Sequence, residues 1–242
     1  MTNLAGKSAV VTGASQGIGQ SIAAALHAAG VRLALLGRSR ERLESSVKNS
    51  ASTTVPPPLL VEADLLDPMS LTAAANQILA ALSTVDILVH CGGAYSRGHW
   101  EDADPDTFSN LMSANVIGPY TLTSLFLPQL IEARGDVVFV NSSVTRSQGS
   151  GASQYKATQH ALQAISNTLR DEFNEKGIRV LSIYPGRTAT PRQEYIHADE
   201  HRDYLPSALL QPSEVADSVL FCLSLPETAE VTDLHIRPRF KS

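Results

Sequence analysis

The sequence has little cysteine, no long apolar run and no excess of positive charge. Its 242 residues hold two cysteines, Cys91 and Cys222, each in an apolar run and without metal-ligand spacing. We expect buried thiols in a reducing cytoplasm and no metal site. No run of 18 apolar residues and no signal-peptide pattern occur, so neither a membrane span nor export is predicted. The formal net charge of −5 argues against nucleic acid or an anionic membrane as the main partner.

Apolar strand-like runs alternate with helical patterns along the whole chain. Strands are predicted at residues 8–13, 31–37, 59–65, 85–93, 135–143, 178–186 and 231–238. Helices are predicted at 20–30, 39–48, 69–83, 106–133 with bends or an end at Pro119 and Pro128, from Tyr155 to about Lys176, and at 212–225. The alternation indicates one α/β domain, residues 1–242, built as a Rossmann-type doubly wound parallel sheet of about seven strands with helices on both faces.

A glycine-rich turn, TGASQGIG at residues 12–19, joins the first strand to the first helix. Gly13 permits a tight turn, Gly17 lets the backbone approach a pyrophosphate, and Gly19 allows the helix to pack closely on the strand. The N–H groups and positive dipole at the helix N-terminus favour a phosphate there. The position of the motif therefore predicts a dinucleotide site.

Several further segments follow this turn in a recognisable order. They are DILVHCGGA (86–94), NVIG (115–118), VNSSV (140–144), Tyr155 and YPG (184–186). Together with the glycine turn they resemble the short-chain dehydrogenase/reductase family over nearly the whole chain. HCGG (90–93) departs from the family's usual Asn-Asn-Ala-Gly. The cofactor-binding residues that this resemblance implies are Gly13, Ser15, Gln16, Gly17, Ile18, Gly19, Arg38, Ser39, Asp64, Leu65, Gly92, Gly93, Tyr155, Gln159, Pro185, Gly186, Thr188 and Thr190.

The end of the second predicted strand discriminates between the two nicotinamide cofactors. An acidic residue there would hydrogen-bond the 2′-hydroxyl of NAD(H), whereas a basic one suits a 2′-phosphate. This chain has Gly37 at the acidic position, followed by Arg38, Ser39 and Arg40. Arg38 can bind a phosphate bidentately, although it could also be an ordinary solvated arginine. We expect NADP(H) rather than NAD(H).

The resemblance also implies a catalytic set. In the family a tyrosine is the general acid/base, a serine holds the substrate oxygen, an asparagine supports a water-linked proton path, and a lysine binds the nicotinamide ribose. These roles map to Tyr155, Ser143 and Asn115, with the adjacent Ser142 as an alternative serine, while the lysine position is Gln159. Gln159 lies one helical turn after Tyr155, so it can still point towards the ribose.

The missing lysine affects the acid/base step. A free tyrosine titrates near ~10, and about 4 kcal/mol of preferential phenolate stabilisation is needed to bring its pKa towards neutrality. Glutamine can hydrogen-bond hydroxyls but carries no charge. Lys156 lies about 100° around the helix from Tyr155 and is expected to point elsewhere. Arg187, in the loop that borders the nicotinamide in the family, is the better alternative cation.

Residues 190–211 are polar and indicate a flap over the substrate. His197 and His201 have the i,i+4 spacing of a metal pair, but we expect a solvated flap without metal. His90, at the end of a strand, is expected to be a hydrogen-bonded histidine rather than a ligand or proton carrier.

Two functions are compatible with these residues. The first is an oxidoreductase that transfers a hydride between NADP(H) and a small carbonyl or alcohol substrate. The second is a dinucleotide-binding, catalytically weak relative that serves as a sensor or oligomer partner, because of Gln159 and HCGG. Apolar residues on more than one face of helices 106–133 and 155–176 predict a homodimer or homotetramer; they are Leu111, Val116, Leu122, Leu125, Phe126, Ala161, Leu162, Ile165 and Leu169.

Overall fold

The computed structural model describes residues 2–48, 55–146 and 151–240. Seven strands form one parallel sheet in the order β3-β2-β1-β4-β5-β6-β7, which confirms the predicted doubly wound fold. The strands are β1 (Ser8–Thr12), β2 (Arg32–Gly37), β3 (Leu59–Glu62), β4 (Ile87–His90), β5 (Asp136–Val140), β6 (Arg179–Pro185) and β7 (Asp233–Ile236). The chain builds outward from β1 to β3 and then returns to place β4 on the other side of β1. This reversal between β1 and β4 is where such sheets bind ligands.

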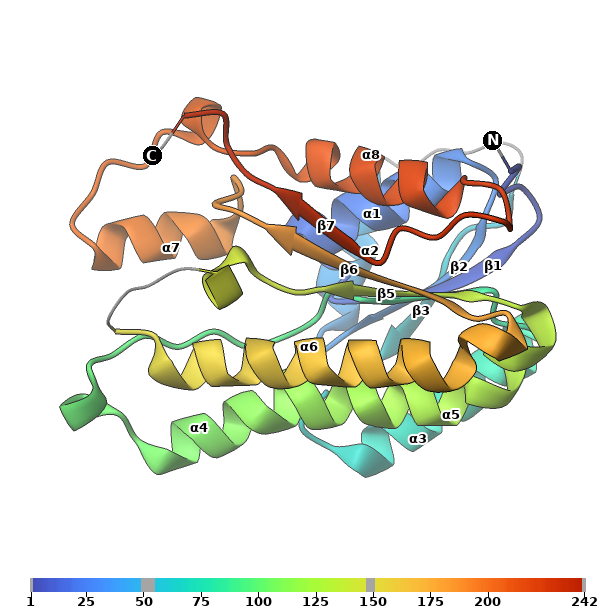
Figure 1. Cartoon of the computed structure of the whole chain (residues 1–242), viewed down its shortest axis with the longest axis horizontal. Coiled ribbons are helices and arrows are strands. Elements are labelled where there is room, and N and C mark those ends of the chain that lie inside the picture. The colour runs from blue at the N-terminus through green and yellow to red at the C-terminus, as the bar shows by residue number, and fades with distance from the viewer. Residues whose placement is uncertain (1, 49–54, 147–150, 241–242) are drawn as a thin grey trace.

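Helices cover both faces of the sheet (Figure 1). The central strands β1 and β4 are therefore buried along their whole length. Helix α1 and helix α8 pack together in one apolar cluster, and α3, α5 and α6 contribute to the second cluster on the other face. The helices are α1 (Gly17–Ala28), α2 (Arg40–Val47), α3 (Pro68–Leu82), α4 (Pro105–Met112), α5 (Gly118–Ala133), α6 (Ser153–Phe173), α7 (Pro191–Asp199) and α8 (Pro212–Leu223).

The long helix predicted at 106–133 is interrupted. Helices α4 and α5 are joined by a π-helical segment, Ser113–Ile117. Pro119 has no N–H, so it cannot donate to the carbonyl of Asn115 four residues earlier, and the α-helical ladder breaks there. Pro128, in contrast, lies inside α5. The interruption brings Asn115 into the site described below.

The predicted flap contains a helix that its polar composition did not reveal. Helix α7 begins at Pro191, and the Thr190 hydroxyl caps it by accepting a hydrogen bond of 3.2 Å from Gln193 N. The prediction of a solvated flap is wrong for His197, which is 3% exposed and packs edge-on against Tyr204. The Ser-, Thr- and Pro-rich composition of residues 49–58 predicts a surface connection. Residues 49–54 of this segment lie outside the described residues.

Among the described residues, no helix is both long enough and apolar enough to cross a membrane.

Candidate functional site

A cleft of about 710 Å³ opens at the carboxyl ends of the parallel strands, beside the reversal between β1 and β4. It brings together residues from the glycine turn, the ends of β2 to β6, the π-helical segment, α6 and the flap. The motif residues that line it are Gly13, Ser15, Gln16, Gly17, Ile18, Gly19, Arg38, Ser39, Asp64, Leu65, Gly92, Gly93, Asn115, Ser143, Tyr155, Gln159, Pro185, Gly186, Thr188 and Thr190.

The glycine turn is packed so tightly that side chains could not be added. Gly13 has φ of 66°, and a Cβ on it would lie 2.6 Å from the Cα of Gly92. A Cβ on Gly19 would lie 2.4 Å from the carbonyl oxygen of Gly13. Both positions therefore need glycine, one for its backbone conformation and for contact with β4, the other for the approach of α1 to β1.

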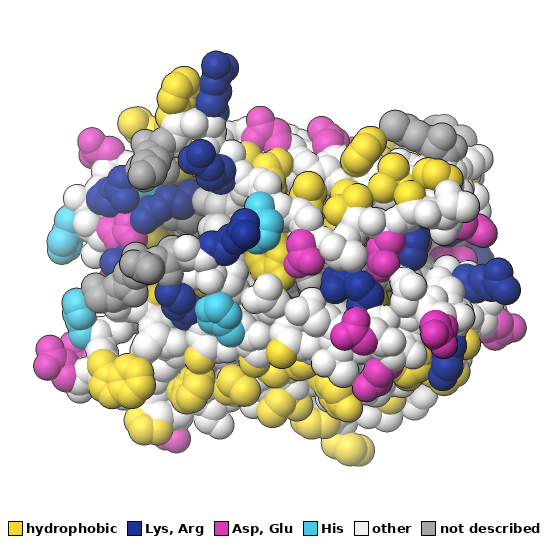
Figure 2. Space-filling model, in the orientation of Figure 1, with side chains coloured by type: hydrophobic (Ala, Val, Ile, Leu, Met, Phe, Trp, Pro, Cys, Tyr) yellow, Lys and Arg dark blue, Asp and Glu magenta, His cyan; other side chains and the backbone are white. Residues whose placement is uncertain are grey.

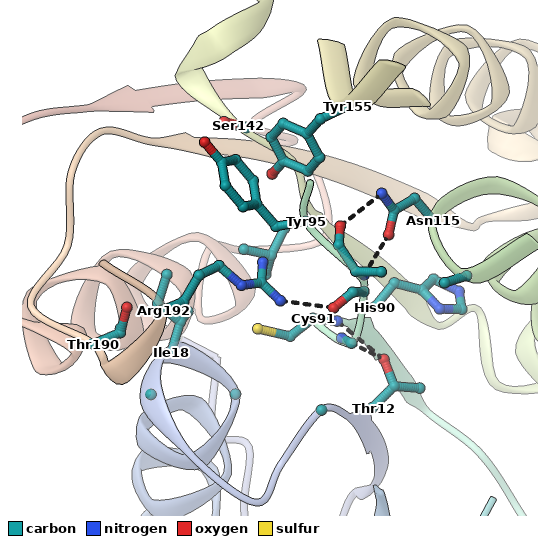
Figure 3. A pocket seen from close by; sticks show the side chains of 18 of the residues that line it. Thr12, Ile18, His90, Cys91, Tyr95, Asn115, Ser142, Tyr155, Thr190 and Arg192 are labelled. Atoms are coloured by element: carbon teal, nitrogen blue, oxygen red, sulfur yellow. Dashed lines mark hydrogen bonds between the residues drawn. The ribbon is translucent and has the colours of Figure 1, made fainter. Parts of the chain in front are cut away.

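The loop after β4 is held from two sides. Thr12 Oγ1, at the end of β1, accepts hydrogen bonds from Cys91 N at 3.1 Å and Gly92 N at 3.0 Å. The Asn115 side chain pairs with the backbone of Ala94, accepting from its N–H at 2.7 Å and donating to its carbonyl at 2.9 Å. These bonds, visible in Figure 3, fix the backbone that forms the cleft wall.

Asn115 also connects this wall to the helix that carries Tyr155. Its Nδ2 donates to Thr158 Oγ1 at 3.0 Å, and Thr158 donates in turn to the carbonyl of Tyr155 at 2.8 Å. The amide group of Asn115 is thus used to join α6 to the loop after β4.

Tyr155 lies at one end of the cleft, packed edge-on against Tyr95 with ring centroids 4.9 Å apart. Ser142 lies near both rings in Figure 3. The Ser142 hydroxyl accepts a hydrogen bond from Val144 N at 3.2 Å, which leaves its own proton available to a substrate oxygen. Ser143 follows as the first residue of a 3₁₀ turn and also lines the cleft.

Gln159 occupies a buried position one turn after Tyr155. The residue is 4% exposed. Its Nε2 donates a long hydrogen bond of 3.4 Å to Thr158 Oγ1. This weak contact leaves the amide able to bind a ligand hydroxyl in the cleft.

Arg187, the alternative cation predicted from the sequence, is paired with a carboxylate. Its Nη2 donates to both oxygens of Glu200, at 3.0 and 2.8 Å, and Arg97 and Arg202 pair with the same carboxylate. Burial alone would raise the pKa of Glu200, but the hydrogen bonds from Arg187 and Arg97 outweigh it and lower this pKa. Arg187 is therefore held by an ion pair, but three arginines share this one carboxylate, so the cluster keeps a net positive charge. Lys156, which the helical angle placed elsewhere, also lines the cleft.

His90 is a buried, hydrogen-bonded histidine, as predicted. Its Nε2 lies 2.8 Å from Thr123 Oγ1, and its ring stacks on Phe139. Burial lowers the pKa of His90 to about 3, so the ring is neutral at physiological pH and is not a proton carrier. His197 and His201 join no cluster of three potential metal ligands in the described part of the chain.

Further residues to which the motifs assigned no role also line the cleft, among them Thr12, Arg42, Cys91, Tyr95 and Arg192. Arg42 could have been found from its place in the first turn of α2, four residues after Arg38. Cys91, expected to be buried, is half-buried, and burial raises the pKa of its thiol to about 12. Tyr95 depends on the fold of the loop after β4, for which the sequence held no signal, whereas Arg192 follows the start signal of α7, Thr190 and Pro191.

Comparisons with known proteins agree with this geometry. The family model for short chain dehydrogenases matches residues 7–201. Dehydrogenase/reductase SDR family member 7B of Bos taurus is 37% identical over 196 residues, covering 78% of this chain and 58% of that protein. This chain therefore spans about three fifths of that relative's length.

Two further proteins are similar over almost the whole chain. An uncharacterized oxidoreductase of Staphylococcus haemolyticus is 30% identical over 240 residues, covering 98% of this chain and 100% of that one. The structure of an alcohol dehydrogenase from Thermococcus sibiricus, complexed with 5-hydroxy-NADP, has a TM-score of 0.87 at 26% identity and covers 98% of both chains. Fold, motif order and sequence identity agree, and this chain belongs to the short-chain dehydrogenase/reductase family.

Proposed function

We propose that this chain is an NADP(H)-dependent oxidoreductase that transfers a hydride between the nicotinamide and a carbonyl or secondary alcohol. One observation carries the proposal: a single cleft is lined by Arg38 after β2, by the glycine turn after β1 and by Tyr155 on α6, and the strand order β2-β1-β4-β5 places these segments in that order. That sequence of groups matches, in order, a 2′-phosphate, a pyrophosphate and a reacting carbonyl. The NADP-type ligand of the Thermococcus sibiricus relative is consistent with the same assignment.

The residues present fit such a cofactor. Helix α1 has no acidic residue in its first turn and no side-chain cap, so its N–H groups are available to a phosphate. Ser39 caps α2 through its hydroxyl, and Arg38 and Arg42 both line the adjacent part of the cleft. Neither arginine forms an ion pair with a carboxylate in the described ranges. Two such arginines, one directly after β2 and one in the first turn of α2, suit a 2′-phosphate better than a 2′-hydroxyl.

The protein's own groups then have distinct tasks. When bound, the nicotinamide supplies or accepts the hydride. Tyr155 Oη gives a proton to the substrate oxygen during reduction and takes it back during oxidation. Ser143, or its neighbour Ser142, donates a hydrogen bond to that oxygen. Gln159 binds ribose hydroxyls, and Asn115 holds the cleft wall against α6.

The catalytically weak alternative is favoured by one observation. The lysine position is a buried glutamine, and Arg187, the cation proposed to replace it, is bound by Glu200. Neither Gln159 nor Arg187 is thereby assigned to stabilising the phenolate of Tyr155. We favour a slow enzyme over a pure binding protein because Tyr155 and both serines line the same cleft.

One paired experiment separates these functions. NADPH binding is measured by calorimetry, and NADPH oxidation is followed over a panel of ketones and aldehydes with wild type and Tyr155→Phe. Binding together with Tyr155-dependent turnover supports the enzyme. Binding without turnover in either protein supports the sensor, and absence of NADPH binding rejects both.

We also propose that the chain forms a homodimer or larger homo-oligomer. The apolar residues first put forward are mostly internal: Leu111, Leu122 and Phe126 are 2% exposed or less. Exposed apolar side chains remain nearby at the start of α5, where Ile117 is 49% and Tyr120 59% exposed. Figure 2 shows hydrophobic atoms gathered along the edge formed by α4 and α5. A second copy could cover this edge.

A further inference from the structure

Arg192 lies across the middle of the cleft. It is the second residue of α7, and its Nη2 donates a hydrogen bond of 2.6 Å to the carbonyl oxygen of Gly93, in the loop after β4. Figure 3 shows its side chain extending from near Thr190 and Ile18 towards the end of β4. The flap is thus joined to the opposite cleft wall by one side chain.

Arg192 has no carboxylate partner, whereas three neighbouring arginines share one. Arg97, Arg187 and Arg202 all pair with Glu200. Arg192 forms no ion pair within residues 2–48, 55–146 and 151–240, and its hydrogen-bond partner is a neutral carbonyl. Its place in the first turn of α7 is unfavourable for a cation, because the helix dipole opposes a positive charge there. An anion bound beside Arg192 would offset this cost.

The surroundings of Arg192 favour an anion. Two residues before it, the methyl group of Thr190 would lie 3.1 Å from a Cβ on Gly17, so this loop faces the N-terminus of α1 across a narrow gap. The uncapped N–H groups of α1 and the Arg192 guanidinium therefore face one part of the cleft from opposite walls. A dinucleotide extending from Arg38 to Tyr155 has its pyrophosphate at this helix N-terminus.

We propose that Arg192 binds the pyrophosphate of the dinucleotide, exchanging the Gly93 carbonyl for phosphate oxygens. This inference rests on the proposed function, since it requires a dinucleotide in the cleft. The exchange replaces a hydrogen bond to a neutral carbonyl with one between oppositely charged groups, which is the stronger kind. Arg192 is then a cofactor-binding residue that holds the flap against the pyrophosphate.

Calorimetric titrations with four probes test this assignment: NADPH, NADH, ADP-ribose and adenosine 2′-monophosphate. The last carries the 2′-phosphate but no phosphate at the 5′ position, where the pyrophosphate is attached. Arg192→Met should weaken binding of the first three by about 10- to 100-fold and change binding of the monophosphate by less than about twofold. Arg192→Lys should recover part of the loss, because it restores the charge but not the bidentate geometry.

Two controls make the result specific. Arg202→Met removes another exposed flap arginine that does not line the cleft, and it should leave all four affinities within about twofold. Arg38→Met should show the reverse pattern, weakening NADPH and the monophosphate but not NADH or ADP-ribose.

Three outcomes would overturn the inference. The first is unchanged ADP-ribose affinity in Arg192→Met. The second is equal weakening of adenosine 2′-monophosphate binding in Arg192→Met, and the third is equal weakening of dinucleotide binding by Arg202→Met. If wild type bound NADPH in these cases, the proposed function would stand and only the role of Arg192 would be rejected. If wild type bound none of the dinucleotides, the proposed function itself would fail.

Discussion

Replacing Gln159 by lysine puts a positive charge in a position that is 4% exposed. The side chain of Gln159 hydrogen-bonds the neutral Thr158 hydroxyl and no carboxylate among the described residues. A lysine at this position would therefore have no anion to compensate its charge in the cofactor-free protein. Burial lowers the pKa of a lysine, and each unit corresponds to about 1.4 kcal/mol. A decrease of about two units predicts that Gln159→Lys loses about 3 kcal/mol of unfolding free energy near neutral pH.

The sign of the pH dependence follows from this lowered pKa. Below the folded-state pKa the lysine is charged in both states, so the full destabilisation is present. As pH rises towards the ordinary lysine value of about 10.4, both states become neutral and the destabilisation disappears. Gln159→Met removes the amide without adding charge, and its destabilisation should not depend on pH in this range. The assay is urea unfolding of the three proteins at about pH 7 and about pH 10.

NADPH should partly reverse the loss, because its phosphates add negative charge to the cleft. Turnover in carbonyl reduction should rise in Gln159→Lys if proton transfer limits the wild type, and its decline at high pH should begin earlier, because a lysine favours the phenolate of Tyr155. Equal stability losses in Gln159→Lys at both pH values would refute the burial argument. A fast wild type, disabled by Arg187→Ala and unimproved by Gln159→Lys, would refute the missing-charge argument.

Three further predictions concern the cofactor, the flap and the assembly. Arg38→Ala should reduce the preference for NADPH over NADH by about 10- to 150-fold in binding titrations, and an unchanged ratio would remove the 2′-phosphate role of Arg38. The pKa of Glu200 is lowered in the folded state by its pairing with Arg187 and Arg97. This pairing therefore stabilises the protein at pH values above 4.5, the ordinary pKa of a glutamate, and the stabilisation is lost as the pH falls through the lowered pKa. Urea unfolding should therefore show a steeper acid loss in wild type than in Glu200→Gln. Light scattering at micromolar concentration should give at least a dimer mass, reduced by Ile117→Glu; a wild-type monomer would contradict the assembly.

The sheet and most of its helices could be predicted because their signals are local. Runs such as residues 8–13 and 135–143 are apolar enough to identify buried parallel strands, and the glycine turn identifies the first strand–helix junction. The break at 113–117 is only partly local: Pro119 indicates a disturbance, but its π-helical form depends on the packing of the surrounding chain. Helix α7 was missed because its composition is polar, although Thr190 and Pro191 are a recognisable start signal.

Within the candidate site, the motif residues line one cleft, but their partners could not be read from the sequence. The pairing of Arg187 with Glu200 joins residues 13 positions apart through the fold of the flap. The contact between Arg192 and Gly93 spans 99 positions and depends on how helix α7 approaches the loop after β4. Long-range pairs of polar side chains leave no periodicity in a sequence. The sequence therefore identifies Arg187 and Arg192 as cations, but it does not show which groups they bind.

We propose above that a hydride passes from NADPH to a carbonyl carbon within this cleft. The most direct test uses NADPH carrying deuterium at nicotinamide C4, in both stereochemical forms, with a ketone that wild type reduces in the panel. Mass spectrometry of the alcohol should show one deuterium from one of the two forms and unlabelled alcohol from the other, and Tyr155→Phe should form no alcohol. Alcohol without deuterium from either form, or full activity of Tyr155→Phe, would contradict the account.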